Sequence, residues 1–136
     1  MARKPLRMAQ VRRTSPQKPR ARPRHLEEAL QAQCVQWFRL QYPGKYILAI
    51  PNGGKRNLFE AVRLKKTGTL AGVADLFVAE PSFPHCGVWI ELKVGKNKPT
   101  LEQRTFLTDM QARDFEVSVV RSLEEFQACI RTYFNA

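Results

Sequence analysis

Residues 88–94 read VWIELKV, an apolar run that contains one glutamate and one lysine. Successive side chains of a β-strand point to opposite faces, so the four aliphatic residues would line one face and Trp89, Glu91 and Lys93 the other. Charged side chains are rarely buried without a partner. The strand therefore either lies at a sheet edge with one solvated face or lines a cleft with its charges.

The hydrophobic periodicity around this run predicts an α/β fold, in which helices flank a mixed central sheet. The expected order is helix, strand, helix, strand, strand, helix, strand, helix. The second helix is capped by Asn57 and ends near Gly68, with Phe59, Val62 and Leu64 facing inward. Both faces of a central strand are covered in such a fold, which favours the cleft. The other elements are expected at residues 26–41, 46–50, 73–79, 88–94, 101–112, 115–120 and 123–133.

The net charge of +11 is concentrated at the N-terminus. Residues 1–24 hold nine basic residues and no acidic one, whereas residues 25–136 hold fourteen basic and twelve acidic residues. Residues 1–24 are also rich in proline and lack apolar periodicity, so we expect a flexible basic arm that precedes one folded domain at residues 25–136. Such an arm is typical of proteins that bind the phosphate backbone of nucleic acids.

A second acidic residue, Asp75, lies at the entrance of the strand that precedes VWIELKV. If the two strands pair as a hairpin, Asp75 and Glu91 come close together on one face. Two neighbouring carboxylates repel each other, and a divalent cation is the usual remedy. Oxygen ligands suit Mg²⁺ or Mn²⁺, and the backbone carbonyl of Leu92 is a further candidate ligand. Lys93 would then lie beside the metal, where its ammonium group can orient an attacking water and stabilise charge on a phosphoryl oxygen.

These residues resemble the PD-(D/E)xK nuclease superfamily, and within it the VRR-NUC family. The resemblance covers roughly residues 26–122 and departs at Ala74, where the family usually has proline. Proline there would only stiffen the chain before the aspartate, so we expect the chemistry to be intact. The matching elements, in order, are the Glu27-Glu28 pair, Pro51-Asn52, Gly72-Val73-Ala74-Asp75, Glu91-Leu92-Lys93 and Gln103.

The resemblance implies a restriction-endonuclease-like fold and a metal-dependent nuclease. Similar short stand-alone members, many from phage, are homodimers that act on branched DNA such as Holliday junctions. It also implies that Glu27 or Glu28 adds a metal or water contact, and the helical spacing favours Glu27 as the inward residue. Gln103 would position the lysine or the nucleophile. However, Thr100 and Gln103 also fit a capping box that merely closes the start of a helix.

Several basic and polar residues are candidates for DNA binding. Lys96 and Lys98 follow the VWIELKV strand directly and are well placed for phosphate contacts. Asn52 belongs to an Asn-Gly turn pair, which structure alone can explain. The remaining candidates are Lys55 and Arg56 in the same region, and Arg12, Arg13, Lys18, Arg20, Arg22 and Arg24 in the arm.

Two other classes of function fit the charge distribution. A non-catalytic nucleic-acid-binding protein would use the same basic arm, and a scaffold protein would dock an acidic partner with it. No apolar stretch approaches the roughly 18 residues that a membrane span needs, and the N-terminus lacks the apolar block of a signal peptide. We therefore expect a cytoplasmic protein of a bacterial or phage-infected cell.

Overall fold

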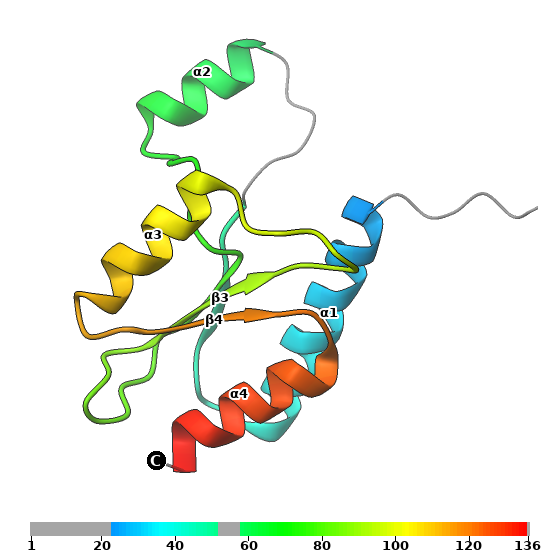
Figure 1. Ribbon diagram of the computed structural model, residues 1–136, viewed down its shortest axis with the longest axis vertical. Coiled ribbons are helices and arrows are strands. Elements are labelled where there is room, and N and C mark those ends of the chain that lie inside the picture. Colours follow the sequence, from blue (N-terminus) through cyan, green and yellow to red (C-terminus); the bar gives the residue numbers. More distant parts are fainter. Residues whose placement is uncertain (1–22, 52–57, 136) are drawn as a thin grey trace, which may run out of the picture.

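A four-stranded mixed sheet with four helices forms the structure, a computed structural model that describes residues 23–51 and 58–135 (Figure 1). The order of helices and strands is the one that the sequence predicts, and most boundaries agree within three residues. The elements are α1 (Pro23–Gln41), β1 (Ile47–Ala49), α2 (Leu58–Lys66), β2 (Leu76–Val78), β3 (Val88–Leu92), α3 (Leu101–Gln111), β4 (Glu116–Val120) and α4 (Leu123–Asn135).

The strands lie in the order β1-β2-β3-β4, so the VWIELKV segment supplies an internal strand. β2 pairs antiparallel with both β1 and β3, whereas β3 and β4 are parallel and connected through α3. In the β2–β3 pair Leu76 lies opposite Ile90. The same register places Asp75 opposite Glu91, as the predicted hairpin requires.

One face of the sheet packs against α1 and α4 and forms the hydrophobic core (Figure 1). α1 presents Leu30, Cys34 and Phe38, which are spaced four residues apart and therefore share one side of the helix. The aliphatic face of β3 meets them. The core residues from the sheet and α4 are Ile47, Leu76, Val78, Val88, Ile90, Leu92, Val120, Phe126, Ile130 and Tyr133.

The opposite face of the sheet is covered by aromatic side chains and α3. Phe77 and Trp89 stack with their ring centroids 4.4 Å apart, and Phe106 of α3 meets Trp89 edge to face at 5.0 Å. Because β3 is covered on both sides, Glu91 and Lys93 are only 1% and 9% exposed. The solvated edge strand is therefore excluded as the explanation of these two charges.

The loop that joins β2 to β3 is tied to the last helix. Ser82 Oγ donates a hydrogen bond to the Tyr133 carbonyl at 2.8 Å, and the Tyr133 hydroxyl donates one to the Glu80 carbonyl at 2.6 Å. Both bonds reach across more than fifty residues of sequence. The hairpin that carries Asp75 and Glu91 is thus fixed at its loop end by α4.

Two expectations about the helices are wrong. Phe59 and Val62 of α2 do not face inward, since they are 86% and 44% exposed and the helix has no buried residue. Helical periodicity identifies an apolar side but not whether anything covers it. In addition, α1 begins at Pro23, so the last two residues of the predicted arm, Pro23 and Arg24, are helical. Proline is favoured at the first helical position because its φ is already set for a helix. Residues 1–22 lie outside the described residues.

Candidate active site

The β2–β3 register brings Asp75 and Glu91 together at one end of the hairpin. Asp75 Oδ2 accepts a hydrogen bond from the backbone N–H of Leu92 at 2.8 Å. This bond fixes the carboxylate of Asp75 against the strand that carries Glu91. The second oxygen of Asp75 takes no part in this bond.

Glu91 is the most deeply buried charged residue of the site. Its Oε1 lies 3.1 Å from Lys93 Nζ, whereas its Oε2 is buried and has no hydrogen-bond partner within residues 23–51 and 58–135. Burial, followed by the negative charge of Asp75, raises the pKa of Glu91 to about 7, against the lowering effect of Lys93. Burial also raises the pKa of Asp75, although the hydrogen bond from Leu92 and the charge of Lys93 oppose the shift.

A third acidic residue approaches this pair from α1. The negative charge of Glu27 raises the pKa of both Asp75 and Glu91, so the three carboxylates share one electrostatic environment. Glu27 is partly buried, whereas Glu28 is exposed and pairs with Arg24 at 3.4 Å. The structure therefore agrees with the choice of Glu27 as the inward residue.

The donor atoms at this point fit a hard divalent cation. Two carboxylates and the nearby Leu92 carbonyl supply oxygen, and the unpartnered Glu91 Oε2 is the kind of buried atom that a cation would satisfy. In the part of the chain that the structure describes, no three acidic, histidine or cysteine side chains come close enough to hold a metal by themselves. Oxygen ligands suit Mg²⁺ or Mn²⁺, which commonly keep several water ligands.

Gln103 takes part in a capping box at the start of α3. Its Oε1 accepts a hydrogen bond from the Thr100 N–H at 2.8 Å, and Thr100 Oγ1 accepts one from the Gln103 N–H at 3.2 Å. Thr100 and Gln103 therefore form the capping box that the sequence predicted at the start of this helix. Because the box uses only the side-chain oxygen, the amide nitrogen of Gln103 is available for a second role.

The turn after β3 presents the two lysines that were expected to bind phosphate. Lys96 and Lys98 are both exposed. The turn between them is held by Arg121, whose Nη1 donates hydrogen bonds to the carbonyls of Gly95 and Asn97 at 3.1 and 2.6 Å. The sequence did not indicate Arg121, because more than twenty residues separate it from this turn and no local pattern links the two.

The other candidate DNA-binding residues fall into two groups. Arg24 is exposed in the first turn of α1. The remaining ones lie outside the described residues, namely Asn52, Lys55 and Arg56, and Arg12, Arg13, Lys18, Arg20 and Arg22 of the arm. Among the described residues, no helix has the length and apolar character needed to cross a membrane.

Gly72 permits the segment that leads to Asp75 and β2 to pass close to α3. Its φ is +88°, and a Cβ built on it would lie 2.7 Å from both the carbonyl carbon and the Cβ of Glu102. A real Cβ cannot occupy that space without a shift of the α3 backbone. The close approach to α3 thus gives a physical reason for glycine at position 72 in this chain.

We expect Gly72→Ala to lower the free energy of unfolding by about 3 kcal/mol, from backbone strain together with overpacking. Gly68→Ala is the matched control, because Gly68 also has a positive φ, +105°, but no atom lies within 4 Å of its built Cβ. It should lose only about 1 kcal/mol. Urea unfolding of both variants measures the difference, and equal losses would contradict the close approach to α3.

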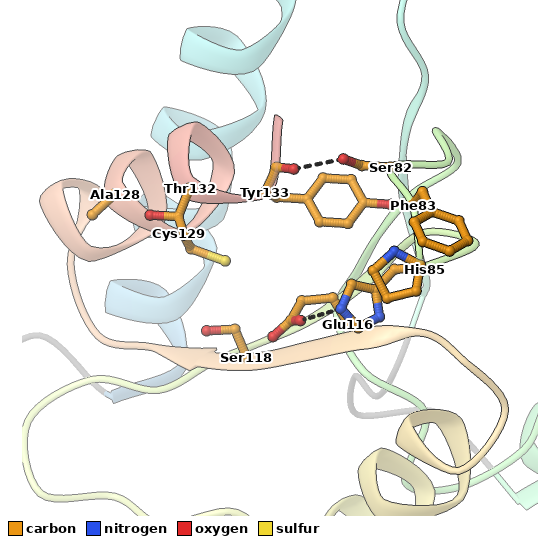
Figure 2. Close-up of a pocket in the computed structure, with 10 residues that line it drawn as sticks. Ser82, Phe83, His85, Glu116, Ser118, Ala128, Cys129, Thr132 and Tyr133 are labelled. Carbon is orange, nitrogen blue, oxygen red and sulfur yellow. Dashed lines mark hydrogen bonds and ion pairs between the residues drawn. The ribbon is translucent and has the colours of Figure 1, made fainter. Parts of the chain in front are cut away.

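A cavity of about 380 Å³ lies at the other end of β3, between β4, α4 and the loop that carries His85 (Figure 2). His85 Nε2 and Glu116 Oε2 are 3.0 Å apart on its wall, and Ser118 and Cys129 line it as well. Glu116 pairs with Val88 at the start of β3, whereas Lys93 follows the end of that strand. His85 therefore lies away from Asp75 and Glu91, and its partner is Glu116.

The fold of this chain is similar to that of a solved structure. No protein-family model and no curated protein matches the sequence. Among solved structures, a chain described as "VRR_NUC domain protein" superposes with a TM-score of 0.69 and 23% sequence identity, over 80% of this chain and 88% of that chain. The chain therefore has the α/β fold of a VRR-NUC domain, as the order of its motifs predicts.

Proposed function

We propose that this protein is a Mg²⁺- or Mn²⁺-dependent DNA endonuclease. The observation that carries the proposal is the buried Glu91 beside Asp75, with one oxygen on Lys93 and the other without a partner in the described residues. Burial of a carboxylate that lacks a full set of partners costs free energy. Such carboxylates are typical of functional sites. The fold of a VRR-NUC domain supports a nuclease.

Each residue of the site has a role in this proposal. Asp75, Glu91 and the Leu92 carbonyl would hold the cation, which lowers the pKa of a bound water and stabilises charge on the phosphate. Lys93 would position the attacking water and offset negative charge as the phosphodiester bond breaks. Glu27 would accept a hydrogen bond from water. Gln103 would use its amide nitrogen to position Lys93 or the nucleophile.

The proposed substrate is DNA, with branched DNA such as a four-way junction preferred. The net charge of +11 and the exposed Lys96 and Lys98 favour a polyanion. Residues 1–22 of the basic arm would add affinity without sequence information, while the nuclease domain would begin with α1 at Pro23. A symmetric pair of cuts across a junction needs two active sites, and one chain supplies one, so we propose that a homodimer acts on this substrate.

A non-catalytic nucleic-acid-binding protein is the competing proposal. It explains the basic charge equally well. It does not explain why the buried Glu91 lies beside the partly buried Asp75, because a protein that only binds phosphate gains nothing from these two carboxylates. The exposed basic residues would suffice for such a protein.

A cleavage assay with the full chain separates the two. Labelled four-way junction, flap and linear duplex DNA are each incubated with Mg²⁺, Mn²⁺ or EDTA. The nuclease predicts products in Mg²⁺ or Mn²⁺ and none in EDTA, and paired symmetric cuts in the junction would support the dimer. DNA binding without cleavage product in every divalent ion would instead support the non-catalytic nucleic-acid-binding protein.

A further inference from the structure

Helix α2 exposes apolar side chains to an unusual degree. Phe59 and Leu58 are 86% and 76% exposed, and Val62 is 44% exposed. Large apolar residues scattered singly are normal on a protein surface, but a group on one short helix marks an interaction site. The covered side of the helix is limited to Ala61 and Leu64, which are only partly buried.

The exposed side of α2 is also basic. The helix contains Arg63, Lys65 and Lys66 against the single acid Glu60, a net charge of +2. Residues spaced three and four apart share one side of a helix, so Phe59, Arg63 and Lys66 lie in one row. Within residues 23–51 and 58–135, Arg63, Lys65 and Lys66 form no ion pair. An aromatic ring and two cations therefore lie on the same exposed side of α2.

The position of α2 connects it to the candidate active site. The helix lies between β1 and β2 in sequence and ends nine residues before Asp75. The chain before it also reaches Asp75, whose carbonyl accepts a hydrogen bond from the Ile50 N–H at 2.8 Å. In Figure 1 α2 projects beyond the start of α3, at the end of the molecule away from the C-terminus. α2 therefore lies toward the start of α3, the helix whose first turn contains Gln103.

We propose that α2 recognises the branch point of a DNA substrate, with Phe59 stacked on an unpaired or unstacked base and Arg63 and Lys66 on the neighbouring phosphates. The inference rests on the proposed function and names the feature of the substrate that this protein selects. Nucleic acid with an open base step offers both an aromatic face and closely spaced negative charges. An apolar protein surface would leave the cations of this row without partners.

The dimensions of the helix agree with this partner. Nine residues of α-helix span roughly 13 Å, which is about the length of four nucleotides along one strand of DNA. Leu58 and Phe59 lie in the first turn of α2, and Arg63, Lys65 and Lys66 lie in its last turn. The phosphates would therefore be held on one side of the branch and the base at the branch itself.

The test is binding by the full chain in EDTA, where no metal-dependent cleavage can interfere. The affinities for a four-way junction and for a linear duplex of equal length are compared for the wild-type protein, Phe59→Ala and the double variant Arg63→Gln, Lys66→Gln. Leu40→Ala and Arg39→Gln are the matched controls, since Leu40 is 73% exposed and Arg39 is exposed in the last turn of α1. A junction with 2-aminopurine at the branch reports unstacking of a base.

We expect Phe59→Ala to lower the ratio of junction to duplex affinity roughly ten-fold, the size of one lost base–aromatic stack, and to abolish the rise in 2-aminopurine fluorescence. The double variant should weaken binding and reduce its salt dependence, while both controls keep the wild-type ratio. An unchanged ratio and fluorescence in Phe59→Ala would overturn the inference. Loss of a dimer in Phe59→Ala on sedimentation, with the ratio unchanged, would assign α2 to a second copy instead.

The outcome is separable from that of the proposed nuclease. A protein that shows the α2 effects in EDTA but yields no product in any metal would refute the nuclease and leave the inference standing. A protein that cuts DNA in Mg²⁺ but shows no α2 effect would refute only the inference. Because Phe59 is almost fully exposed, its replacement should not disturb folding.

Discussion

Replacing Lys93 with alanine is expected to reduce metal-dependent cleavage by about a thousand-fold while DNA binding persists. The ammonium group of Lys93 is 3.1 Å from Glu91 Oε1 and almost fully buried, so no other cation of the described residues can take its place without rearrangement. Its removal also leaves Glu91 without its positive neighbour, which raises the pKa of that carboxylate further. Single-turnover cleavage of labelled DNA in Mg²⁺, together with a binding assay in EDTA, measures both parts.

Lys45→Ala is the matched control for this experiment. Lys45 also pairs with a glutamate, Glu80, at 3.8 Å, but the pair is more exposed and lies near the start of β1. Its loss should leave the cleavage rate at the wild-type value. Asp75→Ala should reproduce the loss seen for Lys93→Ala. DNA cleavage by both the Asp75→Ala and the Lys93→Ala variant would refute the assigned active site.

Glu91 should make the metal-free protein less stable as the pH rises. Its pKa in the folded state is about 7, against 4.5 ordinarily, so folding favours the protonated form. The associated stability is complete below pH 4.5 and is lost as the pH rises to about 7. At roughly 1.4 kcal/mol per unit of pKa, the loss amounts to about 3 kcal/mol. Asp75, whose pKa is also raised, acts in the same direction.

Urea unfolding in EDTA at pH 5 and pH 8 measures this effect in the wild-type protein and in Glu91→Gln. The variant should lose most of the pH dependence and be the more stable protein at pH 8. Added Mg²⁺ should restore stability to the wild-type protein at pH 8 and do little for the variant, because a ligand stabilises only the state that binds it. A wild-type protein that is equally stable at both values of pH in EDTA would show that burial does not raise the pKa of Glu91.

The proximity of Asp75 and Glu91 could be predicted from sequence because strand geometry is simple. Alternation with a period of two places Glu91 and Lys93 on one face, and a short connection between strands implies the antiparallel pairing that sets Asp75 opposite Glu91. The choice of Glu27 over Glu28 followed from helical angles in the same way. Thr100 and Gln103 were ambiguous because one spacing serves both a helix cap and a catalytic role, and the structure shows only the cap.

Features that depend on contacts between distant segments could not be predicted. Arg121 holds the turn that carries Lys96 and Lys98, but no pattern near Arg121 reveals its partner. The apolar spacing of α2 was correct for a helix, yet the sheet does not extend beneath it and Phe59 is exposed. Periodicity describes one element at a time, whereas burial depends on what other elements cover.

The hydrogen bonds from Ser82 and Tyr133 make the far end of the chain part of the site's cooperative unit. The hairpin that carries both carboxylates ends in a loop held by α4, through contacts that span 51 and 53 residues. Local opening of α4 would therefore release the hairpin as well, because elements linked in this way open together. Substitutions in the last helix should consequently be interpreted as changes to the geometry of the two carboxylates, even though none of its residues lies near them in sequence.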